Sequence, residues 1–107
     1  MDWYVVEYLY PDAFGEFKNK MFPNIGVLSL STIECYDVKK LFGFFDREGI
    51  YLNIEMFTTH HWGFTILLHG GIVLCPPQEP KKTRESIECD GFMECFRMLQ
   101  LKITNKL

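Results

Sequence analysis

Two runs of alternating apolar and polar residues form the clearest pattern in the chain. With a loop at 57–61, the apolar positions of the first run face those of the second, from Met56 opposite Trp62 to Ile50 opposite Leu68. A shift of one residue would set apolar against polar faces, so the pattern predicts this antiparallel register. The inner positions are Ile50, Leu52, Ile54 and Met56 in the first run and Trp62, Phe64, Ile66 and Leu68 in the second.

A second hairpin is predicted at Gly70-Gly71, because both central positions of a two-residue turn can adopt positive φ. This turn would pair Ile66 with Cys75 and place the Cys75 thiol on the inner face as a small apolar filler. Residues 76–80 contain three prolines and predict a loop.

Three segments have the apolar spacing of amphipathic helices. The first covers about 11–21, and the second begins at a capping box, Ser31 to Glu34, and ends near Gly49. The third begins at Thr83 as N-cap and continues to about Leu101. Its apolar stripe contains Phe92, Cys95, Phe96 and Leu99, with Gly91 either a weak point or a place where the helix closely approaches the sheet.

The remaining segments complete the predicted fold. Residues 2–10 are rich in Trp, Tyr and Val and predict an opening strand at an edge of the sheet. Residues 25–30 form either a short strand or an extended connector, which periodicity does not decide. The prediction is a single α+β domain over 1–107, with two layers: an antiparallel sheet of four strands, or five, and three helices mainly on one face.

Composition narrows the classes of function. The chain has 107 residues, 48% of them hydrophobic, and a net charge of −3, which is typical of one globular domain. Binding to nucleic acid or to an anionic membrane needs a basic face, so neither partner is predicted. Met1 is followed by Asp2 without a basic segment and apolar run, so we expect a cytoplasmic protein.

Candidate chemistry is sparse. The four cysteines, Cys35, Cys75, Cys89 and Cys95, include no CxxC pair and are predicted to be free thiols, with no disulfide and no structural zinc. No nucleophile with a neighbouring base, phosphate loop or cluster of metal ligands is evident. We therefore predict no catalytic residue, no cofactor and no metal, and a function other than catalysis is favoured.

The outer face of the predicted sheet is the main candidate site. It would display Tyr51, Asn53, Glu55, Thr65, Leu67, Ile72 and Leu74. Either this face is exposed, as a partner or dimer surface would be, or the opening strand or a loop covers it. The favoured function is a small cytosolic protein-interaction module, binding another protein or a second copy through this face or an edge strand.

The alternative is a binder of a small molecule or anion, or a modest enzyme. One candidate pocket lies at the hairpin tip, residues 58–62, with His60, His61 and Trp62. The other lies at the helix start, residues 81–86, where Lys82 and Arg84 could meet an anion. The simpler interpretation is that these are exposed turn histidines and exposed loop charges.

The third helix carries a resemblance. Its Thr83-Arg84-Glu85 start, followed by an apolar stripe, resembles the C-terminal helix of small uncharacterised proteins of bacteria and their mobile elements. Those helices begin Thr-Arg-x-Glu and have an alanine-rich inner stripe, whereas Ser86, Cys89 and Cys95 stand at some of the corresponding Glu or Ala positions here. The resemblance implies an α+β fold and no particular activity.

Overall fold

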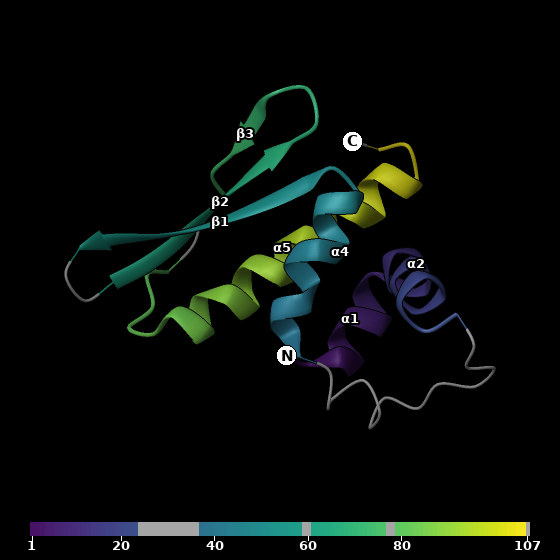
Figure 1. The fold of residues 1–107 in the computed structure, drawn as a ribbon, viewed down its shortest axis with the longest axis horizontal. Helices are drawn as coiled ribbons and strands as arrows, with labels where there is room; N and C mark the ends of the chain where they lie inside the picture. The colour runs from purple at the N-terminus through teal and green to yellow at the C-terminus, as the bar shows by residue number, and fades with distance from the viewer. Residues whose placement is uncertain (24–36, 59–60, 77–78, 107) are drawn as a thin grey trace.

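The elements of the chain are seen in a computed structural model that describes residues 1–23, 37–58, 61–76 and 79–106 (Figure 1). The fold is α+β, as predicted, but this part of the chain contains three strands and four α-helices instead of four or five strands and three helices. In chain order the elements are α1 (Trp3–Leu9), α2 (Pro11–Met21), the 3-10 helix η1 (Val38–Lys40), α4 (Leu41–Arg47), β1 (Ile50–Thr58), β2 (His61–Leu68), β3 (Ile72–Leu74) and α5 (Arg84–Ile103).

The first hairpin has the predicted register. β1 and β2 pair antiparallel, with Met56 opposite Trp62 and Ile50 opposite Leu68. A bulge interrupts the ladder between Met56 and Thr58. The strand order is β1-β2-β3, so β1 and β3 are the outer strands of the sheet.

The register predicted for the second hairpin is wrong by one residue. The loop contains three residues, 69–71, and the Gly71 N–H donates to the Leu68 carbonyl over 3.1 Å. Both glycines of the loop have positive φ, as expected. Because the loop is longer than a two-residue turn, Ile66 pairs with Leu74 instead of Cys75.

This shift changes which side chains lie on each face of the sheet. Cys75 follows β3 and is exposed, so its predicted role as a core filler is wrong. Ile72 and Leu74 pair with inner-face residues of β2 and therefore lie in the inner rows, not on the outer face. Val73, opposite Leu67, takes the place predicted for them.

The opening strand is also wrong, because residues 3–9 form helix α1. The Asp2 carboxylate caps it by accepting a hydrogen bond from the Val5 N–H over 3.3 Å. Trp3 and Val6, three residues apart, are buried on one side of the helix. β-type composition is a weak preference that packing overrides, and here the buried residues recur at helical spacing.

Helix α2 has the predicted bounds and is capped from a distance. The Gln100 side-chain oxygen, from α5, accepts hydrogen bonds from the Asp12 and Ala13 N–H groups, each over 2.9 Å. The Gln100 side-chain NH₂ in turn donates to the Asp12 carboxylate over 2.8 Å. These contacts satisfy unpaired donors of the first turn and join α2 to α5.

The described part of the second predicted helix begins later than expected. The Asp37 carboxylate caps η1 by accepting from the Lys39 N–H, and α4 follows directly. Gly49 has a φ of +76° just after α4 and turns the chain into β1, as predicted. The capping box at 31–34 and the segment 25–30 lie outside the described residues.

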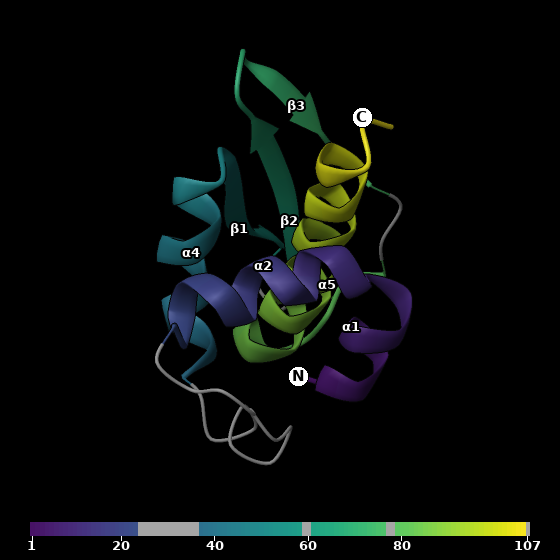
Figure 2. The same ribbon diagram turned by 90° about the vertical axis from the view of Figure 1, so that its right-hand side faces the viewer.

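Helix α5 lies at the centre of the molecule. Figures 1 and 2 show the sheet on one side of α5 and the α1–α2 pair on the other, with α4 beside α5. The Phe96 ring has its centroid 4.9 Å from that of Phe45, 5.8 Å from Trp3 and 5.9 Å from Phe17. One core therefore joins elements from both ends of the chain.

Gly91 lets α5 approach β1 closely, the second of its two predicted roles. A Cβ at Gly91 would lie 2.7 Å from a methyl group of Leu52. A side chain at this position would therefore force the Leu52 side chain to move.

Candidate functional site

The far edge of β2 is paired with other parts of the chain. The Trp62 N–H donates to the Lys81 carbonyl over 2.7 Å, and the Lys81 N–H donates back over 3.1 Å. Near its other end, β2 pairs with β3. The backbone groups of Trp62 therefore point away from β1.

The free edge of β1 follows from the same geometry. Met56 of β1 lies directly opposite Trp62 of β2. Opposite residues of an antiparallel pair either bond to each other or both point their backbone groups outward. The Met56 N–H and C=O therefore point away from β2. By alternation, the backbone groups of Leu52 and Ile54 point the same way. No backbone hydrogen bond joins these outward groups to another residue of the described ranges. We name residues 50–56 with their outward groups the β1 edge.

The start of β1 is anchored by three elements. Glu48, at the end of α4, is buried, and its carboxylate accepts a hydrogen bond from the Lys20 ammonium of α2. The Glu48 carbonyl accepts from the Lys102 ammonium of α5 over 2.6 Å. Hydrogen bonds to Glu48 and Glu16 raise the pKa of Lys20, since both carboxylates stabilise the ammonium form.

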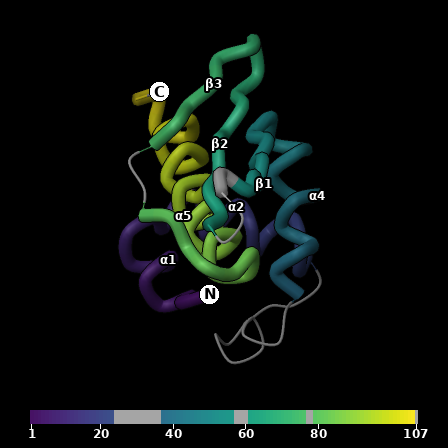
Figure 3. Tube along the Cα trace, turned by 90° about the vertical axis from the view of Figure 1, so that its left-hand side faces the viewer, coloured from purple at the N-terminus to yellow at the C-terminus, as the bar shows by residue number. Residues whose placement is uncertain are grey.

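The outer face of the sheet is the second part of the candidate site. Five of the seven predicted residues lie on it by register: Tyr51, Asn53, Glu55, Thr65 and Leu67. Among the side chains of this face whose exposure the structure describes, the exposed apolar ones are Tyr51 and Leu67, each 40% exposed, and Val73, 64% exposed. Helix α1, which the sequence predicted as a strand at the sheet, lies at the opposite end of the molecule from β3 (Figure 3).

The two predicted ligand positions, the hairpin tip and the start of the third helix, lie close together through Trp62 and Arg84. The Arg84 guanidinium lies 5.9 Å from the ring centre of Trp62, next to exposed His61. Lys82 is exposed, and His60 lies outside the described residues. The start of β2 therefore lies close to the start of α5.

Arg84 also has a carboxylate partner. Its Nε donates to Glu88 over 3.0 Å, and the Lys39 ammonium lies 3.9 Å from the same oxygen. Glu88 is almost fully buried, so these two cations offset the cost of its negative charge. An anion bound at Arg84 would have to compete with this carboxylate, which disfavours the predicted anion site.

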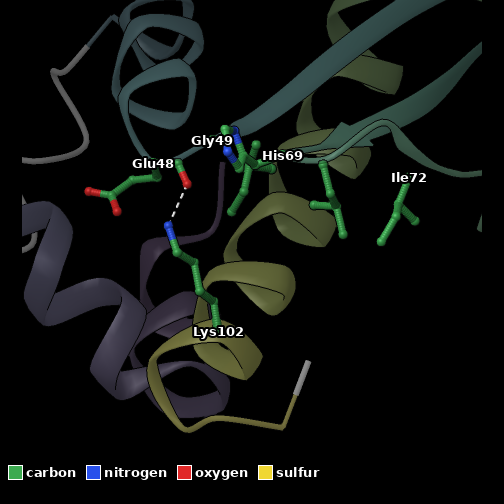
Figure 4. Close-up of a pocket in the computed structure, with 7 residues that line it drawn as sticks. Glu48, Gly49, His69, Ile72 and Lys102 are labelled. Atoms are coloured by element: carbon green, nitrogen blue, oxygen red, sulfur yellow. Dashed lines mark hydrogen bonds between the residues drawn. The ribbon is translucent and has the colours of Figure 1, made fainter.

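A pocket that the sequence did not predict lies where β1 begins. It has a volume of about 270 Å³ and is lined by Glu48, Gly49, Ile50, Leu68, His69, Ile72 and Lys102 (Figure 4). The Lys102 ammonium points to the Glu48 carbonyl, whereas the Glu48 carboxylate points away from Lys102 (Figure 4). The structural role of Lys102 is to satisfy a carbonyl at the end of α4.

Helix α1 carries a second exposed apolar surface that sequence analysis missed. Tyr4 is 63% exposed and Tyr8 84%, and Val5 and Leu9 lie beside them at helical spacing. The sequence signal for this surface was Asp2 as an N-cap, followed by apolar Trp3 and Val6 three residues apart. In a helix that buries these two, Tyr4, Val5, Tyr8 and Leu9 lie towards the outside.

Three of the four cysteines lie in the described ranges. Cys75, Cys89 and Cys95 are free thiols, and burial raises the pKa of Cys95, which disfavours its reactive thiolate. No three His, Cys, Asp or Glu side chains in the described ranges gather as metal ligands. Among the described helices, none combines the length and the apolar character required to cross a bilayer.

The fold is a small α+β structure in which the outward backbone groups of one edge strand have no backbone partner among the described residues. Comparison of the chain with models of protein families, with curated proteins and with solved structures gives no match.

Proposed function

We propose that this protein is an interaction module that binds an extended strand along the β1 edge. The observation that carries the proposal is the set of outward backbone groups at Leu52, Ile54 and Met56, which have no partner among the described residues. A strand laid beside β1 would pair with all of them, as in recognition by strand addition.

The composition of β1 supports binding. At nine residues it is longer than a typical strand of five or six, which offers a long row of donors and acceptors. Natural edges are commonly protected by lysine, proline or a very short strand. β1 contains no lysine or proline, and its one charged residue is Glu55. Its bulge lies beyond Met56 and leaves residues 50–56 regular.

Beyond Ile50, which is buried, the inner-row side chains of β1 are incompletely covered. Leu52 and Ile54 are half-buried, and Met56 is 52% exposed, although all three point to the side that carries the core. Helix α4 meets the start of β1, and the other end of β1 projects past α4 (Figure 1). An added strand would cover apolar area there in addition to satisfying the backbone.

A peptide-display selection tests this function. Peptides selected on the wild-type domain are expected to lose binding to Met56→Pro, which removes an outward N–H while sparing the ladder to β2. They should keep binding to Met56→Thr, the matched control, because threonine retains the N–H and favours strands. Bound peptide should also slow amide exchange at Leu52 and Ile54 but not at Tyr51.

Two outcomes would contradict the proposed function. One is binding that is unaffected by Met56→Pro in a variant whose unfolding curve matches that of Met56→Thr. The other is a selection that yields only peptides whose binding depends on Tyr8 of α1. Either result would place the binding surface away from the β1 edge.

A second candidate function is binding of a small carboxylate with an apolar tail in the pocket of Figure 4. Lys102 has no carboxylate partner among the described residues, and Leu68 and Ile72 supply apolar walls. Screening short-chain and aromatic carboxylates by thermal shift, with Lys102→Met as the comparison, tests it. Equal shifts in both proteins, or none in either, would end this alternative.

A further inference from the structure

We infer that the strand added at the β1 edge is β1 of a second copy of this chain, antiparallel to the first and related to it by a two-fold axis through Asn53. This inference rests on the proposed function and names the partner. It follows from where the regular part of β1 ends, which side chains would then meet, and which side of the sheet carries the helices.

The two-fold axis is perpendicular to the sheet. Such an axis makes two identical edge strands antiparallel and keeps both inner faces on the same side. The result is one six-stranded sheet with both sets of helices below it and both outer faces above. Each chain offers the same edge, so the contact closes as a dimer and leaves no further β1 edge free.

The bulge in β1 selects the centre of the pairing. The regular ladder covers residues 50–56, and its middle residue is Asn53. A two-fold at Asn53 pairs all seven positions, whereas one at Leu52 or Ile54 pairs only five within the regular part. Because the backbone groups of Asn53 point to β2, Asn53 would face its counterpart without hydrogen bonds, and Leu52 and Ile54 on either side would bond across the seam.

The side chains match in this register. On the inner face Leu52 lies opposite Ile54 of the second copy, and Ile50 lies opposite Met56, so apolar residues meet apolar residues. The half-exposed Met56 then gains neighbours near the start of the other β1. This pairing accounts for an apolar inner row that the rest of the chain covers incompletely.

The outer face matches as well. Tyr51 would lie opposite Glu55 of the second copy at two places, and the two Glu55 side chains would stay apart. Like charges directly opposite one another destabilise a strand pair, so their separation favours this register. Within one chain, the Asn53 side-chain NH₂ donates to the Glu55 carboxylate, which holds Glu55 on the outer face.

Cysteine cross-linking tests the register. In a background with Cys35, Cys75 and Cys89 replaced by serine, Asn53→Cys should form a disulfide-linked dimer under mild oxidation with diamide. Facing residues of a pair without hydrogen bonds have Cα atoms about 4.5 Å apart, which suits a disulfide. Tyr51→Cys, offset from its counterpart by four residues or roughly 13 Å along the strand, should not cross-link alone. Combined with Glu55→Cys it should.

Sedimentation velocity supplies the second readout. Wild-type protein should be a dimer at high concentration, and Met56→Pro should raise the dissociation constant by about tenfold or more, because the dimer loses two hydrogen bonds. Met56→Thr keeps the outward N–H and should raise the constant clearly less than Met56→Pro, through lost apolar contact alone. Tyr8→Glu, on α1, should leave it within about twofold.

The outcomes separate this inference from the proposed function. A monomer at all concentrations, with selected peptides still sensitive to Met56→Pro, overturns the second copy as partner and leaves the strand-binding function standing. A dimer that cross-links through Leu67→Cys, or that Tyr8→Glu dissolves, overturns the β1 seam. A monomer whose peptides ignore Met56→Pro overturns both proposals.

Discussion

The two long strands of the sheet, β1 and β2, differ in how far the rest of the chain pairs with their backbones. β2 is completed by Lys81 at one end and by β3 at the other, so its backbone lies inside the fold. The outward groups of β1 between Leu52 and Met56 have no such completion among the described residues. Within the described ranges, β2 is therefore paired on both sides near both of its ends, whereas β1 is paired on one side only.

The side chains of the two strands follow the same difference. Inner-face Phe64 and Ile66 of β2 are 2% and 0% exposed, whereas Leu52 and Ile54 of β1 are only half-buried. The core covers Ile50 at the start of β1 and becomes thinner from Leu52 towards Met56. An edge that is both unpaired and apolar gains most from an added strand.

Truncation on the two strands should give the largest contrast. Phe64→Ala on β2 should lower the free energy of unfolding by about 3 to 5 kcal/mol, because it leaves a cavity in the core. Met56→Ala on β1 should cost less than about 1 kcal/mol, since this side chain is half-exposed. Urea denaturation of monomeric samples at low concentration measures both. Similar losses would mean that the core supports the strands equally.

Helix α5 supports the β1 edge from below through the close contact between Gly91 and Leu52. Gly91→Val should cost about 1 to 3 kcal/mol by pressing on Leu52. The matched control is Gly15→Val in α2, where a Cβ meets nothing within 4 Å and the change from glycine should be neutral or stabilising. Thermal unfolding distinguishes the two, and equal effects would refute the close approach.

A charge introduced on β1, next to the proposed contact, should affect self-association more than a charge introduced on β2. Tyr51→Glu would place a carboxylate opposite Glu55 of the second copy at two sites, raising the dissociation constant roughly three- to tenfold. Tyr51→Lys should lower it by a few-fold for the same reason. Leu67→Glu lies one strand away and should change it little. A larger effect of Leu67→Glu in sedimentation equilibrium would move the contact to the outer face.

The smallest expected effect is at alkaline pH, where the anchor of β1 weakens. The folded pKa of Lys20 lies above its ordinary 10.5, so its contribution to stability is complete below pH 10.5 and is lost as pH rises through the folded value. The side chain is half-exposed, which keeps the contribution small. Tyr10, whose pKa is raised by burial, acts in the same direction. Wild type and Lys20→Met are therefore compared. Between about pH 9 and 12 the melting temperature of Lys20→Met should fall less than that of the wild type.

The register of β1 and β2 could be predicted because period-two alternation leaves one alignment that buries apolar against apolar side chains. The second hairpin could not, since Gly70-Gly71 locates a turn but does not fix whether the loop has two residues or three. One added loop residue was enough to move Ile72 and Leu74 to the inner rows.

Whether the β1 edge is free depends on where residues 2–10 pack, a segment far from β1 in the sequence. The sequence placed a strand at residues 2–10 and expected it at an edge of the sheet, which would have left less edge free. Helix α1 packs instead at the opposite end of the molecule, where the side chain of Gln100 joins the next helix to α5. Such long-range contacts leave no local pattern in the sequence.

Amide hydrogen exchange along β1 measures whether its outward backbone groups are unpaired. In dilute, monomeric protein the N–H groups of Leu52 and Ile54 should exchange at least about tenfold faster than those of Tyr51 and Asn53, which bond to β2. At high concentration the alternation should weaken as the outward groups become paired. Uniform slow exchange from 51 to 54 in the monomer would contradict the account, because it would mean that the β1 edge is already covered.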